Sequence, residues 1–350
     1  MGRRIAFCAD GTWDSVPNDT NVYIISKAIC AIPGEQYSFY DDGVGSDGTP
    51  VEKLLGGAIG LGLFQKIKDG YSTIASVYED GDEVFVFGFS RGAYTARSIA
   101  GMIAICGLPT KNFNQNLVDT AFSAYRDKDH RAQLLATLAP DALYNAQIKM
   151  VGVWDTVGSL GIPGAVFQVS DPLYGFLDTS LHPDVHNAYQ ALAIDEKRRE
   201  FPATLWTGQP APGQILRQVW FAGVHCDVGG SYPETGLSNI TLSWMLTKAA
   251  ALGIEVEPAA AQLYPPLPVD LALAIDTIHE SWNLGWGFWQ HRSIQPDAAI
   301  GNSVAVRVAR VNGYRPPNLH LNGTQLADTY AVENVVASPG IAVAAGSPTS

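Results

Sequence analysis

Three residues in this sequence have the types that nucleophilic chemistry requires. Ser90 stands in GFSRG, a match to the pattern GxSxG. A serine hydroxyl attacks a carbonyl carbon at neutral pH only when a histidine accepts its proton and a carboxylate orients that histidine. His225 in GVHCDVGG and Asp155 in VGVWDTVG each follow an apolar run, as Ser90 does. We therefore predict a site for acyl transfer that combines Ser90, His225 and Asp155.

The sequence around Ser90 supports this interpretation. An apolar run, EVFVFGF at 83–89, leads directly into Ser90, and a small-residue helical pattern follows it. A sharp turn from strand to helix exposes a nucleophile at the edge of a sheet. Gly88 and Gly92 remove side chains where strand and helix come together. The backbone N–H of Arg91, at the start of the helix, is the predicted first donor to an oxyanion.

The second oxyanion donor is predicted in an early loop that ends another strand. FCADGTWD offers the backbone N–H of Gly11 or Thr12, with Asp10 bracing the loop. Donors of this kind stabilise the charge that develops on the carbonyl oxygen during attack.

Two competing assignments stay open at this stage. Asp227 is the rival carboxylate, but it lies two residues from His225, where an extended chain would not bring the two side-chain tips into hydrogen-bond geometry. We expect Asp227 to hold the glycine turn that follows it. His291 is the second choice for the general base.

Alternating strand and helix patterns must position these residues. Predicted strands lie in five runs, each ending in a small or polar cluster: 3–12, 37–45, 83–92, 147–158 and 218–230. Predicted helices cover 63–78, 92–107, 185–199 and 237–253. Strands without polar alternation are typical of a parallel sheet buried on both faces. The fold class is therefore α/β, a doubly wound and mainly parallel sheet flanked by helices, with ligands at the carboxyl ends of the strands.

A single domain is expected over 1–332, followed by a low-complexity tail over 333–350 that frays. Insertions are expected near 107–146, 156–184 and 254–300. Aromatic side chains gather in the third of them, at Trp282, Trp286, Phe288 and Trp289. Together with 156–184, they form either loops packed on the core or a cap that borders an apolar substrate pocket.

Composition excludes several classes of function. The chain has 22 Lys and Arg against 34 Asp and Glu, a net charge of −12. Such a chain is not expected to bind nucleic acid or to adhere to anionic membranes by charge, so membrane contact would come through the substrate. Four separated cysteines, Cys8, Cys30, Cys106 and Cys226, read as reduced thiols, and we predict neither a metal site nor a cofactor.

The N-terminal apolar run is too short for a signal peptide. We expect a cytoplasmic protein, for which export by a dedicated secretion system without a cleaved signal stays open.

Several blocks together resemble a known family. They are FCADGTWD, YDDGVG, GFSRGAYTARSIAGMI, VGVWDTVGSLG, ALAIDEKRREFPATLW and VWFAGVHCDVGGSYPETGLSNITLSWM, between about residues 5 and 250. The sequence resembles the catalytic domain of type VI secretion phospholipase effectors. The resemblance implies an α/β hydrolase-like fold and a serine hydrolase that cleaves carboxylic esters, as a lipase, phospholipase or esterase. It places the catalytic triad on Ser90, Asp155 and His225.

Two alternatives remain beside this reading. A non-catalytic scaffold of the same fold could bind a lipid or a protein partner. An amidase or peptidase could use the same three residues with a different pocket.

Overall fold

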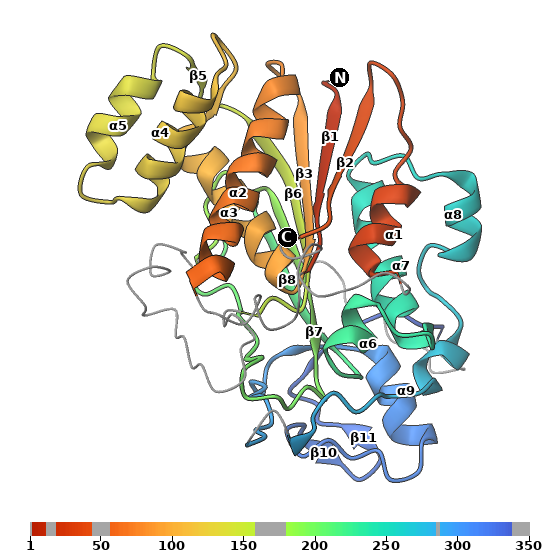
Figure 1. The fold of residues 1–350 in the computed structure, drawn as a ribbon. Coiled ribbons are helices and arrows are strands. Elements are labelled where there is room, and N and C mark those ends of the chain that lie inside the picture. Colours follow the sequence, from red (N-terminus) through yellow and green to blue (C-terminus); the bar gives the residue numbers. More distant parts are fainter. Residues whose placement is uncertain (1, 12–18, 44–56, 158–179, 285–287, 338–350) are drawn as a thin grey trace.

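A central parallel sheet organises the chain (Figure 1). The computed structural model describes residues 2–11, 19–43, 57–157, 180–284 and 288–337. Within them, eight strands form one sheet in the order β12-β9-β8-β7-β6-β3-β1-β2, and each neighbouring pair is parallel. The strands are β1 (Arg4–Ala9), β2 (Gln36–Asp41), β3 (Glu83–Phe89), β6 (Gln147–Trp154), β7 (Asn187–Ala193), β8 (Ile215–Phe221), β9 (Ala299–Gly301) and β12 (Ala331–Glu333). The predicted α/β hydrolase-like class is confirmed.

Helices cover both faces of this sheet, as Figure 1 shows. One face carries α2 (Gly57–Val77) and α3 (Arg91–Cys106), with α4 (Gln115–Arg126) and α5 (Arg131–Leu138) beyond them. The other face carries α1 (Asn21–Ala28) and α7 (Gly236–Ala251), with α8 (Pro258–Leu263) outside. A large apolar core lies on each face of the sheet, and a smaller third core lies around β8, β9 and the helix α9 (Asn302–Arg310). Burial on both faces explains why the strands lack polar alternation.

Smaller elements complete the described chain. Two-stranded ribbons form from β4 (Leu108–Pro109) with β5 (Ala142–Leu143) and from β10 (Leu321–Asn322) with β11 (Gln325–Leu326). The remaining helices are α6 (His225–Gly229), the 3-10 helix η1 (Leu271–Ile275) and α9 (Asn302–Arg310). Among the described residues, no helix is long and apolar enough to cross a membrane.

The helix predicted over 185–199 is wrong. Residues Asn187–Ala193 form β7, a central strand between β6 and β8 in which all seven residues are buried. Alanine, glutamine and leucine favour a helix in isolation, and the segment lacks the β-branched residues that mark strands. Pairing on both edges and burial on both faces override that local preference.

The structured chain also extends past the predicted boundary at 332. Strand β12 adds to the sheet edge beside β9, and Val335 and Val336 are fully buried beyond it. The Asn302 side chain accepts hydrogen bonds from both of these valine N–H groups. Residues 338–350 of the predicted tail lie outside the described residues.

Candidate active site

Ser90 occupies a sharp turn between β3 and α3. The strand ends at Phe89 and the helix begins at Arg91, so Ser90 alone makes the connection. Its φ of 57° and ψ of −120° lie in a region that residues with a side chain seldom adopt. The Ser90 N–H donates to the Trp154 carbonyl at 3.0 Å, which ties the turn to the end of β6. A strained residue held by surrounding structure is a common feature of functional sites.

Two glycines make this turn possible. A Cβ at Gly88 would lie 2.3 Å from the Gly92 carbonyl oxygen, and a Cβ at Gly92 would lie 2.1 Å from the Ala9 carbonyl oxygen. Neither distance is tolerable for a real carbon atom. The glycines thus allow α3 to start against both β3 and the end of β1, which brings the loop after β1 close to Ser90.

Asp10 organises that loop. Its carboxylate accepts hydrogen bonds from the Thr20 hydroxyl, the Tyr40 hydroxyl and the Gly11 N–H. The last of these, at 2.7 Å, already engages the N–H that the sequence suggested for the oxyanion. We therefore leave Gly11 out of the oxyanion hole proposed below. Thr12, the other candidate in this loop, lies outside the described residues.

His225 and Asp155 meet although 70 positions separate them. The Asp155 carboxylate Oδ2 lies 2.6 Å from His225 Nδ1, and both side chains are buried. Asp155 follows β6 directly, with a positive φ of 40° and its N–H donating to the Ala191 carbonyl of β7. His225 is the first residue of the short helix α6, which follows β8. Both residues therefore stand where strands of the sheet end.

Arg292 completes the environment of Asp155. Its guanidinium binds both carboxylate oxygens, from Nη1 to Oδ1 at 2.6 Å and from Nη2 to Oδ2 at 2.9 Å. The Ala193 N–H also donates to Oδ1. Burial alone raises the pKa of the Asp155 carboxyl, but the Arg292 charge and the His225 hydrogen bond outweigh it and hold that pKa well below its usual range. Asp155 is therefore ionised at neutral pH.

The His225 ring lies between two aromatic side chains. The Phe89 ring centroid lies 4.6 Å from the imidazole centroid and the Phe201 centroid 5.1 Å from it. Burial lowers the pKa of His225, although the hydrogen bond and charge of Asp155 act in the opposite direction. In the described part of the chain, the buried Nε2 atom has no hydrogen-bond partner, and no hydrogen bond joins it to Ser90. Such catalytic hydrogen bonds often form only when substrate is bound.

Glu196 supports the backbone of His225. This fully buried carboxylate accepts the His225 N–H at 3.2 Å and binds the Arg198 guanidinium through Nε and Nη2, both at 2.9 Å. The Ser281 hydroxyl donates to both of its oxygens. Burial raises the pKa of Glu196, but the hydrogen bonds and charge of Arg198 lower it to about 2.

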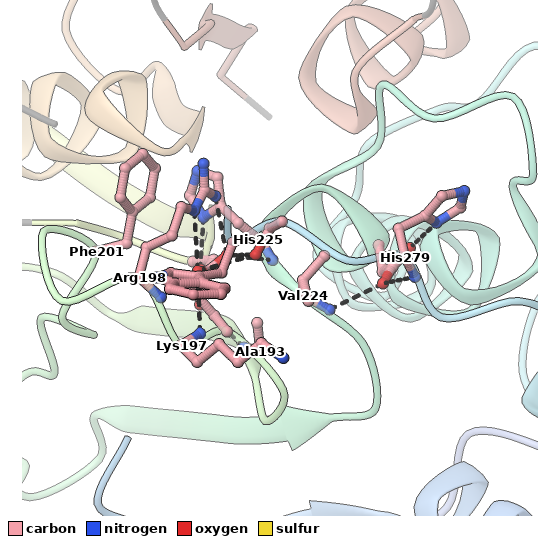
Figure 2. A network of polar contacts seen from close by, with 12 residues as sticks. Ala193, Lys197, Arg198, Phe201, Val224, His225 and His279 are labelled. Carbon is pink, nitrogen blue, oxygen red and sulfur yellow. Dashed lines mark hydrogen bonds and ion pairs between the residues drawn. The ribbon is translucent and has the colours of Figure 1, made fainter. Parts of the chain in front are cut away.

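Asp227 has a different partner from Asp155. Its Oδ1 lies 2.6 Å from Nδ1 of His279, and its Oδ2 accepts the Val224 N–H at 2.9 Å, at the start of α6. Figure 2 shows His279 apart from His225. Glu234 lies 3.0 Å from the other His279 ring nitrogen. Asp227 thus fixes the beginning of the helix that carries His225, without contacting the His225 ring.

The remaining predicted residues are placed less centrally. His291 is half-buried, with its ring 5.1 Å from that of Trp289, and Asp155 is not bonded to it. Phe288 and Trp289 are 83% and 55% exposed. Trp286 and most of the predicted insertion 156–184 lie outside the described residues.

Sequence reasoning missed Arg292 and Glu196. Glu196 lies in the block ALAIDEKRREFPATLW, but nothing in that block showed which of its charged residues would be buried. Arg292 stands beside His291, which the sequence did single out, and no local pattern indicates that its side chain reaches Asp155.

A parallel sheet with a serine on the strand-to-helix turn, and a His–Asp pair from the ends of two strands on either side of β7, has the architecture of the α/β hydrolase class. Residues 3–248 match the family described as "T6SS, Phospholipase effector Tle1-like, catalytic domain". The chain belongs to this family, as its motifs predicted.

The individual proteins that this chain resembles share low sequence identity with it. An uncharacterized protein of Saccharomyces cerevisiae, YEL023C, is 28% identical over 236 residues, which cover 60% of this chain and 33% of the yeast protein. The chain thus spans about a third of this curated relative.

Two solved structures were also matched. An uncharacterized protein from Pseudomonas aeruginosa matches 76% of this chain and 49% of its own, with 15% identity and a TM-score of 0.47. The Tle1 effector bound to the VgrG spike of the type 6 secretion system matches 66% of this chain and 51% of its own, with 16% identity and a TM-score of 0.35.

The buried carboxylate of Glu196 should make stability depend on pH. Its pKa in the folded protein, about 2, lies below its ordinary value of 4.5, so its contribution is full above pH 4.5 and is lost as pH falls towards 2. Glu196→Gln should lower the free energy of unfolding by about 3 kcal/mol at pH 7 and by less than half as much at pH 3. Urea unfolding at both pH values measures this difference.

The matched control is Glu280→Gln, which removes an exposed carboxylate paired with Lys197. It should change the unfolding free energy by less than about 1 kcal/mol at either pH. An equal loss at pH 7 and pH 3 for Glu196→Gln would contradict the ionised state assigned to that residue.

Proposed function

We propose that this protein is a carboxylic ester hydrolase that works through an acyl-enzyme on Ser90. The observation that carries the proposal is the 2.6 Å contact between His225 Nδ1 and Asp155 Oδ2 in a buried site, with Nε2 on the opposite side of the ring. An ionised Asp155 requires the proton on Nδ1, which leaves the lone pair on Nε2. A neutral imidazole in that tautomer is the form a general base must have.

In the first half of the reaction, the Ser90 hydroxyl oxygen attacks the ester carbonyl carbon and its proton passes to His225 Nε2. Asp155 holds the ring and stabilises the imidazolium that results. The oxyanion receives a hydrogen bond from the backbone N–H of Arg91, at the start of α3, where the helix dipole favours negative charge. The intermediate then expels the alcohol, which takes the proton from Nε2, and leaves the acyl group on Ser90.

In the second half, water replaces the alcohol. His225 Nε2 takes a proton from the water, whose oxygen attacks the acyl carbon. The second tetrahedral intermediate expels Ser90, which recovers its proton from His225. The cycle requires no metal or cofactor.

We further propose that the substrate is a lipid ester, with phospholipids as the leading class. The family description supports a phospholipase. Independent support comes from three exposed apolar side chains, Leu284, Phe288 and Trp289, 87%, 83% and 55% exposed. The same segment contacts the loop after β7 that carries Glu196, the acceptor of the His225 N–H, since the Gln290 N–H donates to the Lys197 carbonyl. An apolar projection beside the site fits contact with a lipid surface.

The type VI secretion part of the family description supports export of this chain as an effector. Our proposal of ester hydrolysis rests on this chain's own residues and does not depend on that route.

Removing the Ser90 hydroxyl should abolish the activity. Ser90→Ala should lose labelling by a fluorophosphonate probe and lower turnover of p-nitrophenyl esters by about 10⁴-fold or more, because no other nucleophile replaces it. Labelling and turnover are measured beside thermal unfolding, which should be nearly unchanged. Ser98→Ala, which removes a buried hydroxyl further along α3, is the matched control and should keep both signals. An unlabelled wild type would favour the non-catalytic scaffold.

The two aspartates should differ in their effect on turnover. Asp155→Asn should lower kcat by about 10⁴-fold, because an amide in that position favours the wrong tautomer of His225. Asp227→Asn should lower kcat by about tenfold or less, since Asp227 contacts Val224 and His279 and not the His225 ring. Steady-state kinetics of the two folded variants decides the assignment, and equal losses would reject Asp155 as the specific partner.

The exposed apolar residues should affect the rate of hydrolysis at lipid surfaces and leave that of soluble esters unchanged. The double variant Phe288→Ser, Trp289→Ser should hydrolyse phospholipid vesicles about tenfold more slowly, because burial of two aromatic side chains in a lipid surface is lost. Its turnover of a soluble short-chain ester should be unchanged. Phe113→Ser, at a 38% exposed position before α4, is the control. An unchanged vesicle rate would remove these residues from the substrate contact.

A further inference from the structure

Arg292 is engaged more completely than a surface ion pair requires. All five of its N–H donors have an acceptor: its Nη1 and Nη2 atoms bind Asp155, Nη1 also binds the Ala193 carbonyl, and Nε and Nη2 bind the Phe201 carbonyl. The side chain is 5% exposed. A guanidinium held in this way is a fixed part of the structure, whose charge stays next to Asp155.

This arrangement fixes the plane of the Asp155 carboxylate. Oδ1 accepts from Arg292 and from the Ala193 N–H, while Oδ2 accepts from Arg292 and faces His225 Nδ1. Two parallel bonds from one planar fork define an orientation that a single bond does not. The oxygen that orients His225 is therefore placed by Arg292 and β7 rather than by Asp155's own backbone alone.

The charges around His225 balance. Asp155 and Glu196 carry one negative charge each, and Arg292 and Arg198 carry one positive charge each. The aromatic rings that contact the imidazole in the described part of the chain, those of Phe89 from β3 and of Phe201, are uncharged. A neutral imidazole therefore completes a neutral buried cluster.

We propose that Arg292 is a positioning residue of this site, which holds Asp155 in the geometry that orients His225 and keeps His225 unprotonated for its role as base. The inference rests on the proposed function. It adds a fourth side chain to Ser90, His225 and Asp155, and assigns it two separable effects, one from its shape and one from its charge.

The charge effect has a definite sign. Without Arg292, the cluster of Asp155, Glu196, Arg198 and neutral His225 carries a net negative charge in a buried place. A buried cluster of that kind binds a proton more tightly, so the His225–Asp155 pair stays protonated up to a higher pH. A protonated His225 cannot accept the proton of Ser90, and activity at the acid side is lost.

Two substitutions separate charge from shape. Arg292→Gln removes both, whereas Arg292→Lys keeps a positive charge and loses the bidentate fork. Arg307→Gln is the matched control, because Arg307 is equally buried but binds the carbonyls of Ala274 and Asp276 and does not contact Asp155. Each variant is first compared with the wild type by thermal unfolding, and the pH dependence of kcat/KM for a p-nitrophenyl ester is then measured.

Arg292→Gln should move the acid limb of kcat/KM to higher pH by about one unit or more, since a neighbouring charge changes a pKa by that amount. Arg292→Lys should keep the limb within about half a unit of the wild type and lower kcat by about tenfold, through misplacement of His225. Arg307→Gln should leave both unchanged. If Arg292→Gln does not fold, Arg292→Lys still decides. An unchanged kcat in Arg292→Lys rejects the positioning role. An acid limb of kcat/KM that lies a full pH unit above that of the wild type in Arg292→Lys rejects the role of the positive charge.

A second readout separates this inference from the proposed function. NMR titration of the His225 ring nitrogens in the folded protein reports its protonation without any turnover. An upward shift in Arg292→Gln supports the inference even if the wild type hydrolyses no ester, whereas an active wild type with no shift in that variant rejects it.

Discussion

The buried carboxylate of Asp155 is the constraint on which the site depends. An ionised group without exposure to water needs partners that replace its hydration, and here it has Arg292, His225 and one backbone N–H. These partners come from the segment after β8, from the residues before β9 and from the end of β7. The strand order of the sheet brings these partners together, so the burial of Asp155 at low cost depends on that order. Site and fold are thus parts of one arrangement.

The same requirement accounts for the second polar cluster. His225 stands at the start of α6, a helix of only five residues that has little stability of its own. Glu196 accepts the His225 N–H, and Asp227 accepts the N–H of Val224 just before it. Both carboxylates are nearly fully buried, and each has a cationic or imidazole partner. Together they hold α6 in place through its first backbone N–H groups. The position of the α6 backbone in turn sets the position of the His225 ring.

Where the prediction from the sequence was wrong, tertiary packing had overridden the local preference for secondary structure. Asn187–Ala193 reads as a helix from its residue types and forms a strand because β6 and β8 pair with both of its edges. The tail prediction stopped at 332 because the composition becomes simple there, yet Val335 and Val336 fill the core beside α7 and the 3-10 helix. Neither outcome is visible in a window of neighbouring residues, since the partners lie far away in the chain.

By itself, the sequence determined the alternation of strands and helices, the turn at Ser90 and the carboxyl-edge positions of Asp155 and His225, because each is written in a short contiguous pattern. Only the tertiary structure decided that Asp155, and not Asp227, faces the His225 ring, and that His279 takes Asp227. It also decided that the Gly11 N–H is used by Asp10 and that Arg292 reaches Asp155 over 137 positions. Side-chain pairing across such distances depends on how strands are ordered and buried, and local sequence carries no record of that order.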